Sequence, residues 1–220
     1  METQTPPSAR GEQTRDALLD AAVLVFAREG FRSANLREIA QAAGVNPALI
    51  GYHFRNKQGL YMAVFDRMTG QLRQAFEPVL ARVDQILAAP AEGPPVTRYL
   101  PVLLALIEAM LVHMVHEHPA WGELIVREQH SPTAAYDMLH ERIISRAHQA
   151  LVGLLQGLRK GEDLERVRLL AATIASQALL VRNARTPLLR LLDWEAFGDR
   201  ELDIMKALVR RNTTLLALGD

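Results

Sequence analysis

Apolar side chains in this sequence recur every three to four residues, which is the spacing of an α-helix. From Thr14 onward the pattern is clear, because Leu18, Ala22 and Phe26 lie at i, i+4 and i+8 and would share one helical face. The same spacing returns along the whole chain, and no segment alternates apolar and polar residues as a half-buried strand does. The sequence therefore predicts an all-α fold for its 220 residues.

Composition narrows the classes of function. Lys and Arg together number 25, as do Asp and Glu, so bulk binding of nucleic acid by a polycation is excluded while a local basic face is not. Cysteine is absent, which excludes disulfide scaffolds, thiolate nucleophiles and Cys-ligated metal sites. The glycine-rich phosphate loop, HExxH and GxSxG motifs are absent as well. We therefore expect neither an enzyme nor a cofactor.

Neither the first residues of the chain nor its most apolar stretch indicates a membrane. Residues 1–12 are polar, contain two prolines and are expected to form a disordered tail. The stretch from Val102 to Val115 contains Glu108 and His113 and is too short to span a bilayer of about 30 Å. We expect a cytoplasmic protein with no membrane partner.

Three helix signals follow one another closely before residue 55. Asn35 is a typical N-cap and Glu38 stands three residues later, as in a capping box. Gly44 is expected to end this short helix, and Pro47 suits the first position of the next one. The expected helices cover about 14–30, 35–44 and 46–54, and Asn35 and Asn46 are the expected caps of the second and third.

Two short helices joined by a glycine turn and preceded by a third form a helix-turn-helix arrangement. The second helix of such a pair presents its N-terminal residues to base edges in the major groove, where all four base pairs differ. Between Arg32 and Lys57 there are four basic residues and one acid, Glu38, and the rest of the chain cancels this excess. The segment therefore predicts a reader of double-stranded DNA held by a few phosphate contacts.

The segment LREIAQAAGVNPALIGYHFRNKQGLY, residues 36–61, resembles the DNA-binding domain of TetR-type transcriptional regulators. The likeness covers about residues 13–62, with the IA-x-x-AGV turn, the His53–Phe54 pair and Lys57 at the family's spacings. The resemblance implies a homodimer that reads an inverted repeat and usually represses transcription. It also implies an all-helical C-terminal domain for dimerisation and for binding an unknown small-molecule effector.

A second resemblance lies further along the chain. The segment EHPAWGELIVREQHSP, residues 117–132, and the helix ending in VRNAR, residues 181–185, are similar to the C-terminal domain of the CecR-like subgroup. The two likenesses together imply a DNA-binding domain at 13–57, with its motif at about 35–54, and an effector-binding and dimerisation domain at 58–220.

The first resemblance also implies which residues contact DNA. Expected at phosphates are Asn35, Tyr52, His53 and Lys57, and expected near bases are Asn46, Pro47, Ala48 and Leu49. Arg37 is a further candidate from the local basic excess. Each has a simpler alternative: Arg37 and Lys57 could be solvated surface residues, His53 could close the core, and Tyr52 could be a half-buried helix residue.

One position departs from the family pattern. The commonest family sequence has a tyrosine where this chain has Gly51, and the aromatic residue here is Tyr52. Adjacent residues of a helix point about 100° apart around its axis, so the contact of the family's tyrosine does not transfer directly to Tyr52.

Polar groups within apolar helices are candidates for effector contacts. The candidate pocket residues are Glu108, Met110, His113, Met114, Trp121, Arg127, Tyr136 and Gln177. The alternative is structural, with Arg127 paired to Glu108 or Glu128 and the methionines filling gaps in the core. His113, His116 and His118 suggest a metal site, but their spacing fixes no third ligand, and we expect no metal.

The last two long helices are candidates for a dimer interface. Small residues such as Ala171, Ala172 and Ala175 permit close helix packing, and the pair at about 164–184 and 201–218 resembles the family's four-helix interface. The same helices could be ordinary core. An alternative function remains open as well, namely an architectural or adaptor protein that binds DNA with the same head and answers to a protein partner.

Overall fold

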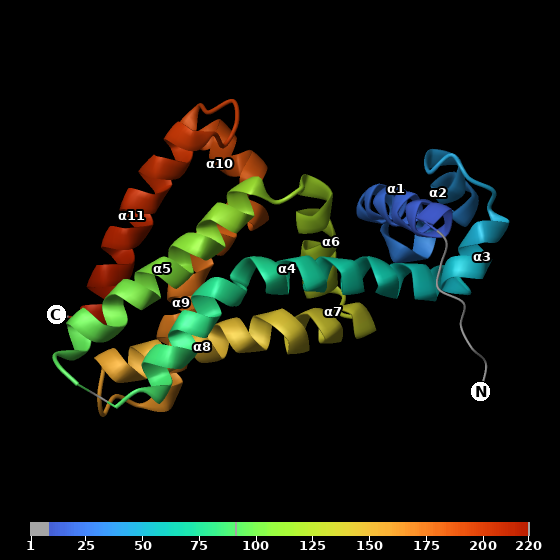
Figure 1. Ribbon diagram of the computed structural model, residues 1–220. Coiled ribbons are helices and arrows are strands. Elements are labelled where there is room, and N and C mark those ends of the chain that lie inside the picture. Colours follow the sequence, from blue (N-terminus) through green and yellow to red (C-terminus); the bar gives the residue numbers. More distant parts are fainter. Residues whose placement is uncertain (1–8, 91, 220) are drawn as a thin grey trace, which may run out of the picture. The chain divides into compact units, whose positions relative to one another are not determined.

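The computed structural model describes residues 9–90 and 92–219, and within these ranges it contains helices and no strand. The all-α prediction is confirmed. The helices are α1 Ala9–Ser33, α2 Leu36–Ala42, α3 Ala48–Phe54, α4 Lys57–Ala88, α5 Pro95–His116, α6 Pro119–His130, α7 Ala134–Leu139, the π-helical η1 His140–Ile144, α8 Ser145–Leu158, α9 Leu164–Asn183, α10 Arg185–Leu192 and α11 Asp199–Leu218 (Figure 1).

Several expected boundaries need correction. Helix α1 begins at Ala9, so the expected tail was wrong for residues 9–12, while residues 1–8 lie outside the described part of the chain. A proline inside a helix is expected to break or bend it, but helix α4 continues through Pro78. We ascribe this to packing, because Phe76 and Leu80 on either side of the proline are buried. Tertiary burial outweighs the loss of one backbone hydrogen bond in the middle of a long helix.

Two features between residues 130 and 200 were missed. The sequence predicts one long helix at about 132–159, but this helix is interrupted by η1, where the backbone takes a π-helical turn between α7 and α8. The short helix α10 was not foreseen because its eight residues include Pro187 and show no clear cap.

The chain divides into two compact units. The first unit contains the residues up to Gly70 together with His118–Leu139, and the second contains Gln71–Glu117 together with the residues from His140 onward. Helices α6 and α7 thus belong with the N-terminal helices and not with the C-terminal domain predicted to begin at residue 58. Helix α4 contributes residues to both units.

The first unit has a core of aliphatic and aromatic side chains. Leu18, Phe26 and Ile39 are fully buried. The ring of Phe26 meets the ring of Tyr61 edge to face, with 4.9 Å between centroids, and Tyr61 lies 5.1 Å from Phe65. Such arrangements add to the stabilisation from apolar burial, so the head is held together around the aromatic side chains of α1 and α4.

The second unit is built around α5, which packs against α8, α9 and α11 (Figure 1). Leu103, Leu106, Ile107 and Leu111 of α5 are fully buried. Within the described residues, α5 is the one helix long and apolar enough to cross a membrane by length and composition. The same composition is expected of a core helix, and 56% of its apolar window is buried inside the protein.

Three arginines bind the carbonyl groups that a helix leaves unpaired at its C-terminus. Arg98 donates to carbonyls at the end of α4 at 2.6 and 2.7 Å. Arg127 does so just before the Gly30 kink in α1 at 3.0 and 3.1 Å, and Arg159 at the end of α11 at 2.8 and 3.1 Å. A cation there satisfies the free carbonyls and the negative end of the helix dipole.

Candidate nucleic-acid interface

The α2–α3 pair forms as its capping residues predict. The side chain of Asn35 accepts a hydrogen bond from the backbone N–H of Arg37 at 2.9 Å, and Asn46 accepts one from the N–H of Ala48 at 2.9 Å. Between them Gly44 has φ +68°, a left-handed conformation that costs glycine little. The predicted capping roles of Asn35 and Asn46 are confirmed.

Helix α3 divides its residues between the core and the surface. Ile50 and Phe54 are buried, which fixes the helix on the head. On the other side Asn46, Pro47 and Ala48 are exposed and Leu49 is half-buried. Tyr52 is 81% exposed, so it is a surface residue and is not half-buried. The N-terminus of α3 and the side of Tyr52 therefore face away from the core.

The turn from α3 to α4 is tight. Arg55 adopts φ +69°, and Asn56 accepts a hydrogen bond from the N–H of Gly59 at 2.8 Å, which caps the first turn of α4. Gly59 lies so close to the end of α3 that a Cβ there would stand 3.1 Å from the carbonyl carbon of Phe54. This close approach sets the angle at which α3 leaves the long helix.

Lys57 makes contacts within the head. Its Nζ donates to the carbonyl of Arg32 at 2.9 Å and lies 5.3 Å from the centroid of the Phe31 ring. The lysine thus holds the end of α1 to the start of α4. An ammonium group has three donors, so this contact leaves hydrogen-bonding capacity for a phosphate. His53 is half-buried, with its ring 5.0 Å from that of Tyr52.

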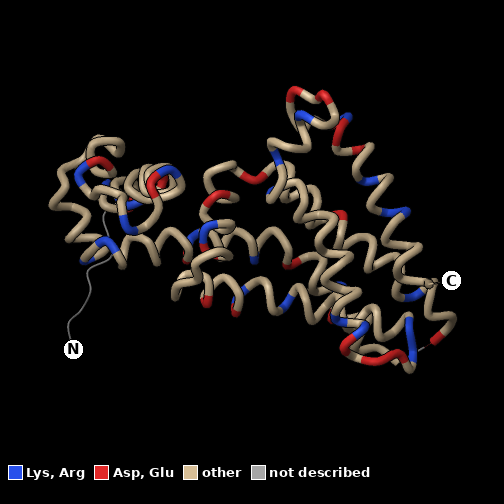
Figure 2. Tube along the Cα trace, turned by 180° about the vertical axis from the view of Figure 1, so that it is seen from behind, with Lys and Arg blue, Asp and Glu red and all other residues tan. Residues whose placement is uncertain are grey.

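The charges on the head are arranged unevenly. Glu38, the acid of the segment, forms an ion pair with Arg28 of α1. The side chain of Arg37 has no hydrogen bond or ion pair to the residues that the structure describes, and it is exposed. Elsewhere basic and acidic positions are interspersed along the helices (Figure 2). The head therefore has an unpaired positive charge on α2, as phosphate contacts require.

A buried network joins α6 to the N-terminal helices. The hydroxyl of Tyr61 donates to Glu128 at 2.7 Å, and the other carboxylate oxygen of Glu128 accepts from the N–H and hydroxyl of Thr133 at 2.9 and 2.8 Å. Glu128 is 3% exposed. Burial and the nearby carboxylate raise the pKa of Tyr61, so its hydroxyl stays a donor. No local pattern in the sequence predicts this pair, because its residues lie 67 positions apart.

The candidate effector residues fall into both units. In the first unit, Arg127 caps α1, as described above, and Trp121 and Tyr136 lie on α6 and α7. In the second, Met110 and Met114 are buried, Glu108 pairs with Arg210, and Gln177 donates to the buried hydroxyl of Thr213 at 3.3 Å. The predicted pairing of Arg127 with Glu108 or Glu128 was wrong, because Arg127 binds backbone carbonyls of α1 and Glu108 pairs with Arg210.

His113, the remaining candidate, belongs to a buried polar cluster with Glu117 and Arg182. Glu117 lies 3.8 Å from His113 Nε2 and 3.8 Å from Arg182 Nε, and the carboxylate and guanidinium side chains are 3% and 9% exposed. Glu117 Oε1, His113 Nε2 and Arg182 Nε have no hydrogen-bond partner among the described residues. Glu117 and Arg182 were not among the predicted residues, although the i, i+4 spacing of His113 and Glu117 is visible in the sequence.

Burial governs the ionisation of this cluster. It lowers the pKa of His113, with a further contribution from the charge of Arg182. It raises the pKa of Glu117, against the opposing effect of Arg182. Among the described residues, no group of three His, Asp or Glu side chains is arranged to hold a metal ion.

Helices α9 and α11 present apolar side chains to solvent. Leu169 of α9 is 70% exposed and Leu208 of α11 is 57% exposed. The other large exposed apolar residues of the two helices include Leu180, Ile204, Leu215 and Leu218. A single exposed leucine is ordinary, but a set on two neighbouring helices is typical of an interface.

Known proteins match both parts of the chain. The family model for bacterial regulatory proteins of the tetR family matches residues 18–64, and the model for the C-terminal domain of the HTH-type transcriptional dual regulator CecR matches residues 101–219. The dual regulator CecR of Shigella flexneri is 30% identical over 212 residues, which are 96% of this chain and 94% of that protein.

Solved structures have the same fold. A transcriptional regulator of Pseudomonas aeruginosa PAO1 superposes with a TM-score of 0.61 at 22% identity, covering 94% of this chain and 93% of its own. FadR from Bacillus subtilis, in complex with stearoyl-CoA, gives a TM-score of 0.57 at 20% identity, covering 93% and 98%. The chain belongs to the TetR family of helix-turn-helix transcriptional regulators and, within it, to the CecR-like subgroup.

Proposed function

We propose that this protein is a homodimeric, cytoplasmic repressor that binds an inverted-repeat operator and is released from it by a small-molecule effector. The observation that best supports the DNA-binding part is the arrangement of α3. Its buried Ile50 and Phe54 fix the helix, while its N-terminus and Tyr52 stand exposed, and the preceding helix α2 carries the unpaired charge of Arg37.

The residues divide into two kinds of contact. Tyr52, His53, Lys57 and the N-cap Asn35, with Arg37, would bind phosphates and set the register on the duplex. Pro47, Ala48 and Leu49 would meet the base edges, chiefly through apolar contact with thymine methyl groups. The side-chain oxygen Oδ1 of Asn46 accepts the capping hydrogen bond from Ala48, which leaves the side-chain N–H groups of Asn46 for base acceptors.

Dimerisation would use the exposed leucines of α9 and α11. A two-fold dimer holds two copies of α3, and each enters a major groove about 34–36 Å from the other on one side of the duplex. Burial of apolar side chains such as Leu169 and Leu208 would drive the association. An inverted repeat in the operator mirrors this two-fold symmetry.

For the effector we infer a site in the second unit. Its core contains the His113, Glu117 and Arg182 cluster, whose unpartnered polar atoms could bind a polar group of a ligand. Unsatisfied buried polar atoms are costly, and a ligand that supplies their partners gains from that cost. The dimer binds its operator only when its two DNA-binding heads have the spacing of the two half-sites. An effector releases DNA to the extent that it binds more tightly to a conformation with another spacing.

The proposal is tested by selecting bound sequences from a random DNA library with the purified full-length protein at fixed near-physiological salt. We expect an enriched inverted repeat. Retention of DNA without enrichment would contradict the repressor proposal and favour an architectural protein that binds the backbone. Failure to retain DNA, repeated after refolding to remove any bound ligand, would contradict DNA binding altogether.

A further inference from the structure

A groove of about 550 Å³ lies in the second unit between α8 and the first half of α9. Its volume is within the range of small-molecule sites. Eleven residues line it, all from η1, α8 and α9, and none of them is an Asp or Glu. None belongs to the His113 cluster or to the helix-turn-helix head, so the groove is a separate feature of the protein.

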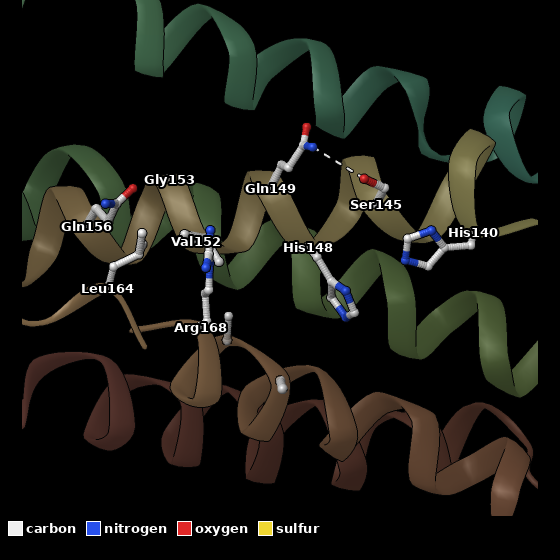
Figure 3. A pocket seen from close by; sticks show the side chains of 11 residues that line it. His140, Ser145, His148, Gln149, Val152, Gly153, Gln156, Leu164 and Arg168 are labelled. Carbon is white, nitrogen blue, oxygen red and sulfur yellow. Dashed lines mark hydrogen bonds between the residues drawn. The ribbon is translucent and has the colours of Figure 1, made fainter. Parts of the chain in front are cut away.

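The polar side of this groove consists of groups that suit an anion. Arg168 of α9 reaches across towards α8, and His148 extends from α8 into the same space, with His140 further along (Figure 3). The Arg168 guanidinium has no hydrogen bond or ion pair within the described part of the chain. The two acids just before α9 are engaged elsewhere, because Glu162 pairs with Arg159 at 2.9 Å and Asp163 caps the helix.

The π-helical turn η1 accounts for the approach of the two histidines. In a regular α-helix, residues eight apart point about 80° away from each other around the axis. A π turn accommodates one extra residue, a step of about 100°, which brings His140 and His148 to within about 20°. The pKa of His148 is lowered first by burial and then by the neighbouring His140, as two imidazoles on one side of a groove require.

The remaining lining is apolar or neutral. Val152 and Gly153 of α8 and Ala171 and Ala172 of α9 form an apolar floor beside the basic groups. Gln149 and Gln156 add neutral hydrogen-bonding groups along α8 (Figure 3). A ligand that fits this lining has one anionic group and an apolar body.

The groove and the proposed dimer face lie on different sides of α9. Leu164, Arg168 and Ala172 follow at i, i+4 and i+8 and form one stripe along the helix. The exposed Leu169 and Leu180 form another, about 100° around the axis. A dimer through the second stripe therefore leaves the first available to a ligand.

We propose that this groove is a binding site for a small organic carboxylate, with the carboxylate held by Arg168, His148 and His140 and its apolar part along α8 and α9. Arginine binds a carboxylate in a bidentate manner, and each imidazole adds an N–H donor. This proposal does not depend on the repressor proposal, because its test involves no DNA.

The test is calorimetric titration of the full-length protein with 4-phenylbutanoate, next to the neutral amide 4-phenylbutanamide and to acetate. We expect 4-phenylbutanoate to bind with a Kd on the order of 1 mM or tighter. The amide lacks the charge and acetate lacks the apolar body, so both should bind at least about tenfold more weakly. In NMR spectra, the imidazole signals of His140 and His148 should shift with the carboxylate.

Variants locate the site. Arg168→Gln should weaken carboxylate binding about tenfold or more, as expected for a charge-assisted hydrogen bond. Arg166→Gln is the matched control, because Arg166 is an exposed arginine on the same turn of α9 that does not line the groove. His148→Gln should weaken binding without altering the preference for an apolar body.

Three results would overturn the proposal. These are no binding of 4-phenylbutanoate at about ten times the expected Kd, equal binding of acid and amide, and equal weakening by Arg166→Gln and Arg168→Gln. Thermal unfolding of both variants guards against a misfolded protein. If the selected DNA library showed no inverted repeat while the titration succeeded, the repressor proposal would fail and the carboxylate site would stand.

Discussion

Gly59, in the first turn of α4, lies against the last carbonyl group of α3, so that a Cβ at position 59 would stand 3.1 Å from the carbonyl carbon of Phe54 and overlap its oxygen. The helix that faces outward from the head is therefore positioned by the absence of a side chain on the helix that follows it. The glycine of the KQG sequence, residues 57–59, thus allows the close approach that orients α3, the candidate DNA-reading helix.

Gly59→Ala should destabilise the head and displace α3. The added methyl group meets backbone atoms, which cannot turn aside as a flexible side chain can, and overpacking of this kind costs about 1–3 kcal/mol. Gly70→Ala is the control, because the same helix has open space there and the change should stabilise it by about 0.5–1 kcal/mol. Denaturant unfolding of both variants measures the two effects. Equal stability of the two variants would contradict the close approach.

Tyr61→Phe should lower the free energy of unfolding by about 1–3 kcal/mol. The change removes the hydroxyl that donates to Glu128 at 2.7 Å and leaves one oxygen of a buried carboxylate without that donor. Tyr52→Phe removes a hydroxyl from a residue that is 81% exposed and should change stability by less than about 0.5 kcal/mol. Chemical denaturation of the two variants provides the comparison, and a neutral Tyr61→Phe would show that Glu128 finds another donor.

Lys57→Ala should weaken binding to all DNA sequences and flatten the dependence of log affinity on log salt by about one unit. It should also lower stability by about 0.5–1.5 kcal/mol, because Nζ donates to the Arg32 carbonyl. Arg37→Ala removes a charge with no partner among the described residues, and it should flatten the salt dependence without a change in stability. Binding titrations at several salt concentrations, with thermal unfolding alongside, separate the two roles.

Leu208→Glu should convert the proposed dimer to a monomer at micromolar concentration. The side chain is 57% exposed on α11, and a carboxylate there would have to be desolvated in an interface. Leu24→Glu on α1 is a matched control, since Leu24 is also exposed but lies outside the proposed dimer face. Sedimentation equilibrium compares the two, and an undisturbed dimer in Leu208→Glu would place the interface elsewhere.

Acidification below about pH 6.5 should destabilise the protein through His113. Its pKa is lowered in the folded state, so between that value and the ordinary one the unfolded chain binds more protons. The contribution of neutral His113 to the free energy of unfolding is therefore complete above pH 6.5. It is lost as the pH falls through the window from 6.5 to the pKa of His113 in the folded protein. Glu117 has the opposite sign, because its pKa is raised, and its window extends upward from the ordinary pKa of a glutamate.

The measurement is the free energy of unfolding as a function of pH for the native protein and for His113→Gln. The variant should show a shallower decline between pH 7 and the acidic end of the window. His148 has a lowered pKa as well, so His148→Gln should remove a further part of the decline. An unchanged decline in both variants would contradict the assignment to these imidazoles.

Local chemistry explains how much of the head could be predicted from the sequence. The caps at Asn35 and Asn46 and the turn at Gly44 depend on residues within a few positions of one another, so their pattern is complete in the sequence. The likeness to the tetR family rests on the same short segment, and the family model that matches residues 18–64 agrees with it.

Long-range packing decided the rest. The bond from Tyr61 to Glu128 joins positions 67 apart in sequence, and Arg127 finds its carbonyl partners on α1, where the sequence suggested a carboxylate. The continuation of α4 through Pro78 and the π turn at His140 likewise contradict local signals. By itself the sequence determined the helices, the helix-turn-helix motif and the family, because these follow from spacing. Only the tertiary structure decided which polar groups are buried together and where a groove forms, because both depend on which helices pack against each other.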